Sequence, residues 1–372
     1  MGRFVRRVFG ARSGRSRLLV ASALVGLVFA PGQAWSVPTL WQVAAQGGSP
    51  LHGVSCVSAK FCAAVGGATS SNTVIEMWDG TAWTHVTNIA PAEVSLSGVS
   101  CVSTTFCVAA GYTRPGTIRQ TYIDVWNGST WSSVPSPNRG ARDSTLMAVS
   151  CVSTTSCVAV GRYFRPPHQH TLIEAWDGVS WSIATSPSEP GHDDVLYGVS
   201  CSTAASCLAV GSGLSSSGVR RPLVETWNGA TWSIIRTPHL AHPANFVGVS
   251  CVSLTSCVAV GLISLTDSTF ATLAEFWDGA NWTQTRTPNP GTTENNLFSV
   301  SCTTGTNCVA VGGYVKYVNS KDRTLILNWD GTRWSRATRF PNARLYGVSC
   351  VDDDTCYAVG FSGLAALVLA GT

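Results

Sequence analysis

The chain has 372 residues and a formal net charge of +4, with 24 Lys and Arg against 20 Asp and Glu. Six of the arginines lie before residue 18, so the rest of the chain carries 18 basic and 20 acidic residues, a net charge of −2. Proteins that bind nucleic acids usually carry a clustered excess of basic residues. This composition argues against a nucleic-acid partner, and we expect none.

The N-terminus has the pattern of an export signal. Arginines at positions 3, 6, 7, 12, 15 and 17 precede an apolar run over residues 18–30, and small residues follow at Gly32 and Ala34. The run is too short to span a bilayer comfortably. We predict a signal peptide over residues 1–34, general secretion rather than twin-arginine export, and an extracellular mature protein without a membrane span. An uncleaved N-terminal anchor is the alternative.

The mature sequence repeats one unit with changes, and residues 148–181 are a clear copy of it. A complete unit has a GVSC-like segment, five residues, a second cysteine followed by a segment like AVG, a variable gap, and a Trp-Asp/Asn-Gly-x-x-Trp corner. A period of about fifty residues indicates a propeller, a solenoid or an array. The pairs use all 14 cysteines and are Cys56/Cys62, Cys101/Cys107, Cys151/Cys157, Cys201/Cys207, Cys251/Cys257, Cys302/Cys308 and Cys350/Cys356.

Paired cysteines in an exported chain indicate disulfides. The five residues between the partners allow them to face each other across an antiparallel hairpin, at the separation that an S–S bond needs. Structural zinc sites use tighter Cys-x-x-Cys pairs, usually with histidines, and neither feature repeats here. We therefore predict seven disulfides, no bound metal and no cofactor.

Within one unit the hydrophobic pattern has a period of two, as in strands. The segments LMAVSC, CVAVG, TLIEAW and WSIAT of residues 146–185 give four short strands, a to d in chain order. The Asp-Gly or Asn-Gly corner is typical of the turn between strands c and d. Four strands per unit correspond to one propeller blade. The regularly placed Trp pairs indicate packing between neighbouring blades.

The two ends of the chain complement each other. Seven a–b hairpins are present, but only six complete Trp-Asp/Asn-Gly corners, because the chain ends after a strand-c candidate at residues 364–370. The missing strand d is found at residues 40–44, where Trp41 occupies the place of Trp83. We predict an all-β, seven-bladed β-propeller over residues 35–372, a single domain whose N-terminal strand completes the last blade and leaves no unpaired strand at the seam.

The repeat resembles two known propeller repeats. The glycine after strand b, the aromatic-Asp pair and the later Trp resemble the kelch repeat, and the Asp-Gly-x-x-Trp turn is similar to the Asp-box of sialidase-type propellers. A kelch-like double glycine occurs only at Gly66-Gly67 and Gly312-Gly313, the Asp-box spacing is one residue short, and the cysteine pair belongs to neither pattern. The resemblance implies the fold and not an activity.

The connections between strands differ in how much they vary. The a–b and c–d connections, on one face of a propeller, are nearly uniform, whereas the b–c and d–a connections on the other face vary in length and chemistry. Variable loops on a uniform scaffold are where binding sites are found. We predict a binding site on the b–c/d–a face, and name as candidates Tyr163, Arg165, His168, Arg220, Arg221, Tyr314, Tyr317 and Arg323.

Two further sets of residues are interpreted conservatively. His168 and His170, with His192, Asp193 and Asp194, have metal-ligand chemistry but occur in one repeat only. An acidic residue recurs two positions before the strand-c Trp, at Glu76, Asp124, Glu174, Glu225 and Glu275, and is replaced by Asn328. Its recurrence favours a structural hydrogen-bonding role over a catalytic one, and we assign no catalytic residues.

The sequence is thus interpreted as a secreted binding module, expected to be a monomer, whose partner is an extracellular glycan or protein. The alternative is an extracellular glycoside hydrolase or lyase on the same scaffold, which would need two carboxylates at a defined separation. A structural envelope protein without a small ligand is a third interpretation.

Overall fold

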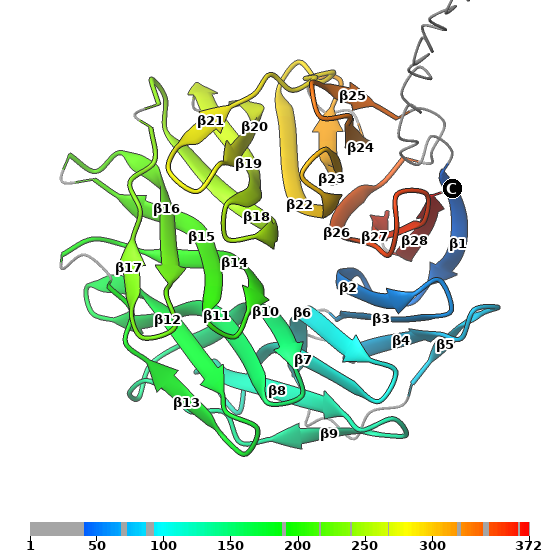
Figure 1. Cartoon of the computed structure of the whole chain (residues 1–372), viewed down its shortest axis with the longest axis vertical. Coiled ribbons are helices and arrows are strands. Elements are labelled where there is room, and N and C mark those ends of the chain that lie inside the picture. The colour runs from blue at the N-terminus through cyan, green and yellow to red at the C-terminus, as the bar shows by residue number, and fades with distance from the viewer. Residues whose placement is uncertain are drawn as a thin grey trace, which may run out of the picture. The chain divides into compact units, whose positions relative to one another are not determined.

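A computed structural model describes residues 41–67, 73–86, 93–187, 191–215, 217–238, 240–266, 268–317, 321–337, 342–363 and 365–371. The predicted signal peptide lies outside these residues. The described residues form seven antiparallel sheets of four strands each, arranged as blades around a centre (Figure 1). The predicted fold class is confirmed.

The first three blades follow one another along the chain. Blade 1 contains β2 (Leu51–Ser58), β3 (Phe61–Gly66), β4 (Val74–Trp78) and β5 (Trp83–His85). Blade 2 contains β6 (Val94–Ser103), β7 (Phe106–Thr113), β8 (Gln120–Trp126) and β9 (Trp131–Val134). Blade 3 contains β10 (Ser144–Ser153), β11 (Ser156–Arg165), β12 (His168–Trp176) and β13 (Trp181–Ala184).

The remaining blades keep the same order of strands. Blade 4 contains β14 (Val195–Thr203), β15 (Ser206–Leu214), β16 (Arg220–Trp227) and β17 (Trp232–Ile234). Blade 5 contains β18 (Ala244–Ser253), β19 (Ser256–Thr266), β20 (Thr269–Trp277) and β21 (Trp282–Gln284). Blade 6 contains β22 (Glu294–Thr304), β23 (Asn307–Val315), β24 (Asp322–Trp329) and β25 (Trp334–Arg336). Blade 7 contains β26 (Arg344–Cys350), β27 (Cys356–Ser362), β28 (Ala365–Gly371) and β1 (Trp41–Gly47).

Blade 7 joins the two ends of the described chain. Its strand order is β1-β28-β27-β26, and β1 pairs antiparallel with β28, with Trp41 opposite Gly371. In Figure 1 the blue β1 lies beside the red β28. The predicted closure is confirmed.

One row of paired residues crosses each blade. In blade 3, Cys151 is opposite Cys157, Cys157 is opposite Trp176, and Trp176 is opposite Trp181. The cysteine spacing and the Trp spacing therefore define the same strand register.

All seven predicted disulfides form, each within its own repeat. The Cα–Cα distances are 3.9 to 4.0 Å, and the bonds are Cys56–Cys62, Cys101–Cys107, Cys151–Cys157, Cys201–Cys207, Cys251–Cys257, Cys302–Cys308 and Cys350–Cys356. No free cysteine is found in the described part of the chain. The prediction from the Cys-x5-Cys spacing is confirmed.

The two partners of each disulfide differ in burial. The first cysteine of each pair, on strand a, is half-buried. The second, on strand b, is at most 2% exposed at Cys62, Cys107, Cys157, Cys207, Cys257, Cys308 and Cys356. It points into the interface with the preceding blade, as where Cys107 clusters with Val65 and Cys257 with Leu208. Cys62 and Cys308 pack in the same way, against Val359 and Val258. These seven residues therefore belong to the hydrophobic core and offer no surface to a ligand.

The two tryptophans of a corner have different roles. The first Trp ties the corner to the a–b turn of its own blade, as where Trp176 Nε1 donates to the Thr154 carbonyl at 3.0 Å. The second Trp packs between blades: Trp181 is 7% exposed and lies in a cluster with Val108 and Ile123 of blade 2. The first Trp also reaches the neighbouring blade, as where the ring centroids of Trp329 and Phe276 of blade 5 are 4.4 Å apart, so the predicted interblade packing holds for both tryptophans of the pair.

The serine of each GVSC-like segment links neighbouring blades. In blade 2, Ser100 Oγ accepts a hydrogen bond of 2.9 Å from the backbone N–H of Cys151 in blade 3. The same bond joins every other pair of neighbouring blades at 2.9 to 3.0 Å. The innermost strands are therefore connected by a continuous set of serine bonds.

Two glycines of a complete unit are required by close contacts or backbone geometry. A Cβ at Gly161, at the end of the AVG segment, would lie 2.0 Å from the Thr145 carbonyl oxygen on strand a. In the c–d corner Gly178 has φ of 97°, which favours glycine. The Asp177 carboxylate accepts from the backbone N–H groups of Val179 and Ser180 at 2.8 Å, and these bonds lower its pKa.

Candidate functional site

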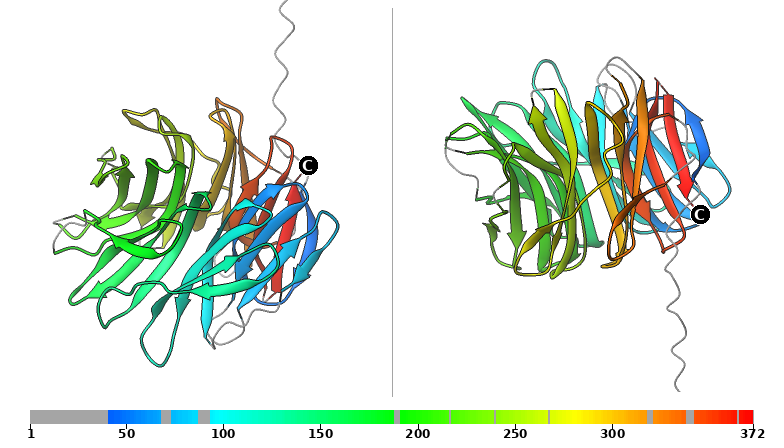
Figure 2. Two further views of the ribbon diagram at one scale, coloured as in Figure 1. Left: turned by 60° about the horizontal axis from the view of Figure 1, so that its bottom comes forward. Right: turned by 90° about the horizontal axis from the view of Figure 1, so that it is seen from above.

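The two faces of the propeller carry opposite charge. The b–c hairpins and the d–a loops lie on one face, here called the variable-loop face, and the a–b and c–d turns lie on the other, here called the uniform face. Figure 2 shows loops along both edges of the blades. The sequence alone did not predict this separation, because its two charge totals nearly cancel.

The charged residues can be counted over the described part of each face. The variable-loop face carries six acidic residues, Glu93, Asp143, Asp193, Asp194, Glu294 and Asp322, against fourteen basic ones. The basic residues are Arg114, Arg119, Arg139, Arg142, Arg162, Arg165, Arg220, Arg221, Arg236, Arg286, Lys316, Lys321, Arg323 and Arg344. The uniform face carries Lys60 and Arg333 against Asp79, Asp177, Asp278, Asp330, Asp352, Asp353 and Asp354. An electropositive face of this kind steers and retains acidic partners.

The predicted binding residues lie on the variable-loop face but in three separate places. Tyr163, Arg165 and His168 belong to the β11–β12 hairpin of blade 3, Arg220 and Arg221 to the start of β16 in blade 4, and Tyr314, Tyr317 and Arg323 to the β23–β24 hairpin of blade 6. In the described part of the chain, the blade 4 pair lines a pocket together with other charged and polar groups.

The blade 3 hairpin forms a stacked cluster. The Tyr163 ring stacks on His170 with a centroid distance of 5.2 Å, and the Arg139 guanidinium lies 5.2 Å from the Tyr163 centroid. His168 Nδ1 lies 3.6 Å from the Asp193 carboxylate. Burial, and then the charges of Arg165 and His168, lower the pKa of His170. These rings pack mainly on one another.

The blade 6 hairpin is more open. Tyr314 and Arg323 face each other in the register of β23 and β24. Tyr317 is 60% exposed, and the Lys316 ammonium lies 5.3 Å from its ring centroid. This hairpin therefore offers an exposed aromatic ring beside basic groups.

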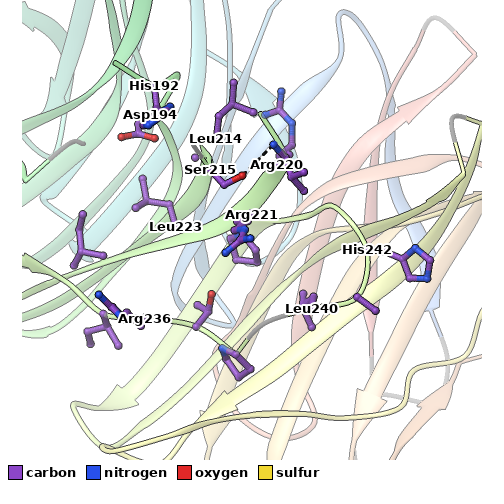
Figure 3. A pocket seen from close by; sticks show the side chains of 18 residues that line it. His192, Asp194, Leu214, Ser215, Arg220, Arg221, Leu223, Arg236, Leu240 and His242 are labelled. Carbon is purple, nitrogen blue, oxygen red and sulfur yellow. Dashed lines mark hydrogen bonds between the residues drawn. The ribbon is translucent and has the colours of Figure 1, made fainter. Parts of the chain in front are cut away.

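The pocket on blade 4, here called the blade 4 pocket, has a volume of about 610 Å³ (Figure 3). The β15–β16 hairpin, the d–a loop that follows β17 and the loop that precedes β14 supply its walls. Its polar side chains are those of Arg220, Arg221, Arg236, His192, His242, Asp194, Ser215 and Thr237, and its apolar lining includes Leu214, Leu223, Ile234, Ile235 and Leu240.

The arginines of the blade 4 pocket are available for a ligand. Arg220 donates through a terminal guanidinium nitrogen to Ser212 Oγ at 2.9 Å. Within the described residues, none of Arg220, Arg221 and Arg236 forms an ion pair with a carboxylate. Asp194 is the single carboxylate of the lining and is 3% exposed. The accessible charge at the mouth is therefore positive.

Sequence reasoning missed Arg236 and the aliphatic lining. Arg236 follows strand d of blade 4, a segment that the repeat assigns to the scaffold. A signal was present in Ile234-Ile235, because the equivalent residues of blade 2 are Ser133 and Val134, and those of blade 5 are Gln284 and Thr285. An apolar outer strand beside a basic hairpin marks the pocket.

A second hollow lies along the channel lined by the innermost strands, with a volume of about 160 Å³. At its mouth Tyr346 packs against Phe298 with a centroid distance of 5.2 Å and against His52 at 5.8 Å. Burial raises the pKa of Tyr346 and lowers that of His52. Sequence reasoning missed this aromatic group, because its members occupy the most variable position of strand a.

Two carboxylates converge near this mouth. Arg344 donates to Glu294 at 2.9 Å and to Asp322 at 2.7 Å. The arginine joins β22, β24 and β26, so it ties blade 6 to blade 7. This ion-pair network is the one place on the described variable-loop face where an arginine joins two carboxylates.

Four of the five recurring acidic residues of strand c, Asp124, Glu174, Glu225 and Glu275, are buried, whereas Glu76 is half-buried and lies 3.3 Å from His85 of its own blade. Glu174 accepts a hydrogen bond of 2.8 Å from Ser136 of the preceding blade, and burial raises its pKa to about 8. Glu225 accepts from Ser186 at 2.9 Å, and burial raises its pKa to about 7. Asp124 accepts from Tyr122 at 2.9 Å. Glu174, Glu225 and Asp124 therefore have the structural hydrogen-bonding role that the sequence predicts for this position.

Glu275 departs from that pattern. Both of its carboxyl oxygens are buried without a hydrogen-bond partner among the described residues, and burial raises its pKa to about 7. Because an unpaired buried carboxylate is costly, burial favours the protonated form of this side chain. A shared position in the repeat therefore does not guarantee a shared set of contacts.

No group of three or more His, Cys, Asp or Glu residues in the described part of the chain is placed to hold a metal ion. No helix of that part of the chain is long and apolar enough to cross a membrane.

Comparison with known proteins identifies the fold only. No family model matches the chain, and no curated protein is similar to it in sequence. Among solved structures, "YCF48 bound to D1 peptide" has a TM-score of 0.59 and 14% identity, covering 93% of this chain and 100% of that chain. The WD40 β-propeller domain of Doa1 has a TM-score of 0.58 and 13% identity, covering 89% and 97%. YCF48 from Cyanidioschyzon merolae has a TM-score of 0.55 and 13% identity, covering 89% and 98%.

At these identities the likeness extends to the seven-bladed propeller scaffold alone. It does not extend to the kelch or Asp-box type of repeat that the sequence resembles. The first of these structures contains YCF48 bound to a peptide.

Proposed function

We propose that this protein is a secreted binding module that takes an extracellular protein or glycan ligand on its variable-loop face. The blade 4 pocket carries the proposal, because it combines an apolar lining with arginines that have no carboxylate partner in the described structure. Most ligand pockets are apolar cavities with a few polar groups that fix orientation. The exposed basic and aromatic hairpin of blade 6 would enlarge the contact surface.

The extracellular location rests on two features. The N-terminal segment has the pattern of an export signal, and every cysteine is in a disulfide. Disulfides of this number persist in oxidising compartments. The fold would then display one basic and variable face to the surroundings.

An extracellular carbohydrate-active enzyme is the second candidate, and Glu294 and Asp322 at the channel mouth are the observation in its favour. Glycoside hydrolysis uses two carboxyl groups, one of them protonated. Here the same arginine binds both carboxylates and holds them in a contact between blades 6 and 7. Binding therefore accounts for this face better than catalysis.

The test is a combined glycan and peptide array probed with the exported, oxidised protein, followed by incubation of each hit to detect cleavage. Binding without turnover supports the module. The control is a variant in which the β11–β12, β15–β16 and β23–β24 hairpins are replaced by short Gly-containing turns, and it should lose the hits. Turnover that Asp322→Asn abolishes would replace the module by the enzyme.

A further inference from the structure

We infer that the blade 4 pocket binds a peptide segment of a partner protein in which acidic side chains alternate with aliphatic ones. The inference rests on the proposed function and gives its ligand a chemical class. Three features support it: the apolar lining of the pocket, its arginines without a carboxylate partner in the described structure, and the positive charge of the surrounding face.

The lining provides two kinds of contact side by side. Leu223 is 8% exposed, and Leu214, Ile234, Ile235 and Leu240 are half-buried around it. Aliphatic side chains of a ligand would bury their surface here, at about 25 cal/mol for each Å² removed from water. The pocket volume suits a few such side chains and not a whole domain.

The arginines sit around this apolar surface. Arg220 and Arg221 come from the start of β16, and Arg236 from the loop after β17, so cationic groups approach from two elements (Figure 3). Guanidinium groups bind carboxylates through paired, charge-assisted hydrogen bonds, and arginine clusters are a recurring device for acidic peptide motifs. The Ser212 hydroxyl holds Arg220 in place at 2.9 Å, which reduces the entropy lost on binding.

The lining favours a peptide over a glycan. Sugar sites commonly place an aromatic plane against the sugar ring, and the residues that line the blade 4 pocket include no Trp, Tyr or Phe. The aromatic rings of the described face lie elsewhere, on the hairpins of blades 3 and 6 and at the channel mouth. Leu, Ile and Pro beside Arg instead match the side chains of an acidic and aliphatic peptide.

The experiment uses the exported, oxidised protein and labelled short peptides in which Leu and Ile alternate with Glu, beside matched peptides with Gln in place of Glu. Fluorescence anisotropy should show the Glu peptides binding at least about tenfold more tightly, with an affinity that falls as salt is added. The double variant Arg221→Glu/Arg236→Glu should weaken Glu-peptide binding by about tenfold or more. The control Lys60→Glu reverses one charge on the uniform face, half the charge change of the double variant, and should leave the affinity within about twofold.

Three outcomes would overturn the inference. Equal binding of Glu and Gln peptides, no binding of either, or Glu-peptide binding that the double variant leaves intact excludes the pocket as an acidic-peptide site. If glycans still bind, or if the β11–β12 or β23–β24 hairpin carries the peptide binding, the proposed function survives. Loss of binding only in the Lys60→Glu variant contradicts both. Thermal melting of every variant checks that the fold is retained.

Discussion

The backbone N–H of Cys56 in blade 1 donates a hydrogen bond of 3.0 Å to the hydroxyl of Ser349 in blade 7. The two residues are separated by 293 positions in the sequence, yet the bond repeats the one that joins each pair of consecutive blades. The bond shows that the first and last blades meet through the same contacts as any other two. Closure is therefore built into the repeat itself, in addition to the pairing of β1 with β28.

Removal of this hydroxyl should weaken the closing interface. We expect Ser349→Ala to lower the free energy of unfolding by about 1 kcal/mol, because the half-buried Cys56 N–H loses its partner. Urea denaturation measures the change. Ser182→Ala is the matched control, since Ser182 lies exposed on strand β13, and it should be nearly neutral. Equal stability of the two variants would contradict a contribution from the serine bonds.

Strand β1 should contribute far more to the stability of the fold than its length indicates. Trp41 is 2% exposed and packs with Leu345, Leu367 and Leu369 of blade 7. We expect deletion of residues 41–44 to cost more than about 4 kcal/mol, because it removes a buried Trp and exposes the edge of β28. Deletion of residues 115–118, in the β7–β8 hairpin, is the control of equal length. Similar thermal midpoints for the two proteins would refute the closure argument.

Each disulfide should contribute modestly to the stability of the fold. The bridge between Cys201 and Cys207 spans a sequence separation of 6, and the closure of so short a loop constrains the unfolded chain by about 2 kcal/mol. We expect Cys201→Ser/Cys207→Ser to fold and to lose about that much stability. Non-reducing peptide mapping of the parent protein should find seven links, each within one repeat. Free thiols, or links between repeats, would be incompatible with the hairpin pairing.

The sequence predicted what depends on spacing within one repeat. The Cys-x5-Cys and Trp-Asp-Gly-x-x-Trp patterns define the blade, its register and the count of seven, and Trp41 identified the closing strand. The serine bonds were missed because the partner of each serine lies in another blade, about fifty residues away. The blade 4 pocket was predicted only in part, because Arg236 follows the outer strand β17, in a segment that the repeat assigns to the scaffold. The distribution of charge over two faces likewise requires the direction in which each strand runs.

The buried carboxyl groups should make the protein more stable in mild acid. Glu174 and Glu225 have ordinary pKa values near 4.5, and burial raises the pKa of Glu174 to about 8 and that of Glu225 to about 7 in the folded protein. At pH values between the ordinary pKa and the raised pKa of each group, the folded state holds a proton that the unfolded state has released. The linkage relation then requires the free energy of unfolding to fall as pH rises, by as much as about 1.4 kcal/mol per pH unit for each group.

The double variant Glu174→Gln/Glu225→Gln isolates this contribution, because an amide keeps the shape of the side chain and does not titrate. Compared with the parent protein, its free energy of unfolding should fall less steeply between about pH 5 and pH 8, the range between the ordinary and raised pKa values. Asp177→Asn is the control. Hydrogen bonds in the c–d corner lower the pKa of Asp177, so that group is already ionised throughout the range and its removal should leave the slope unchanged. Urea denaturation across the range measures all three proteins. Identical slopes for the parent and the double variant would mean that these carboxyl groups reach solvent, and that the interfaces between blades 2, 3 and 4 are looser than their packing indicates.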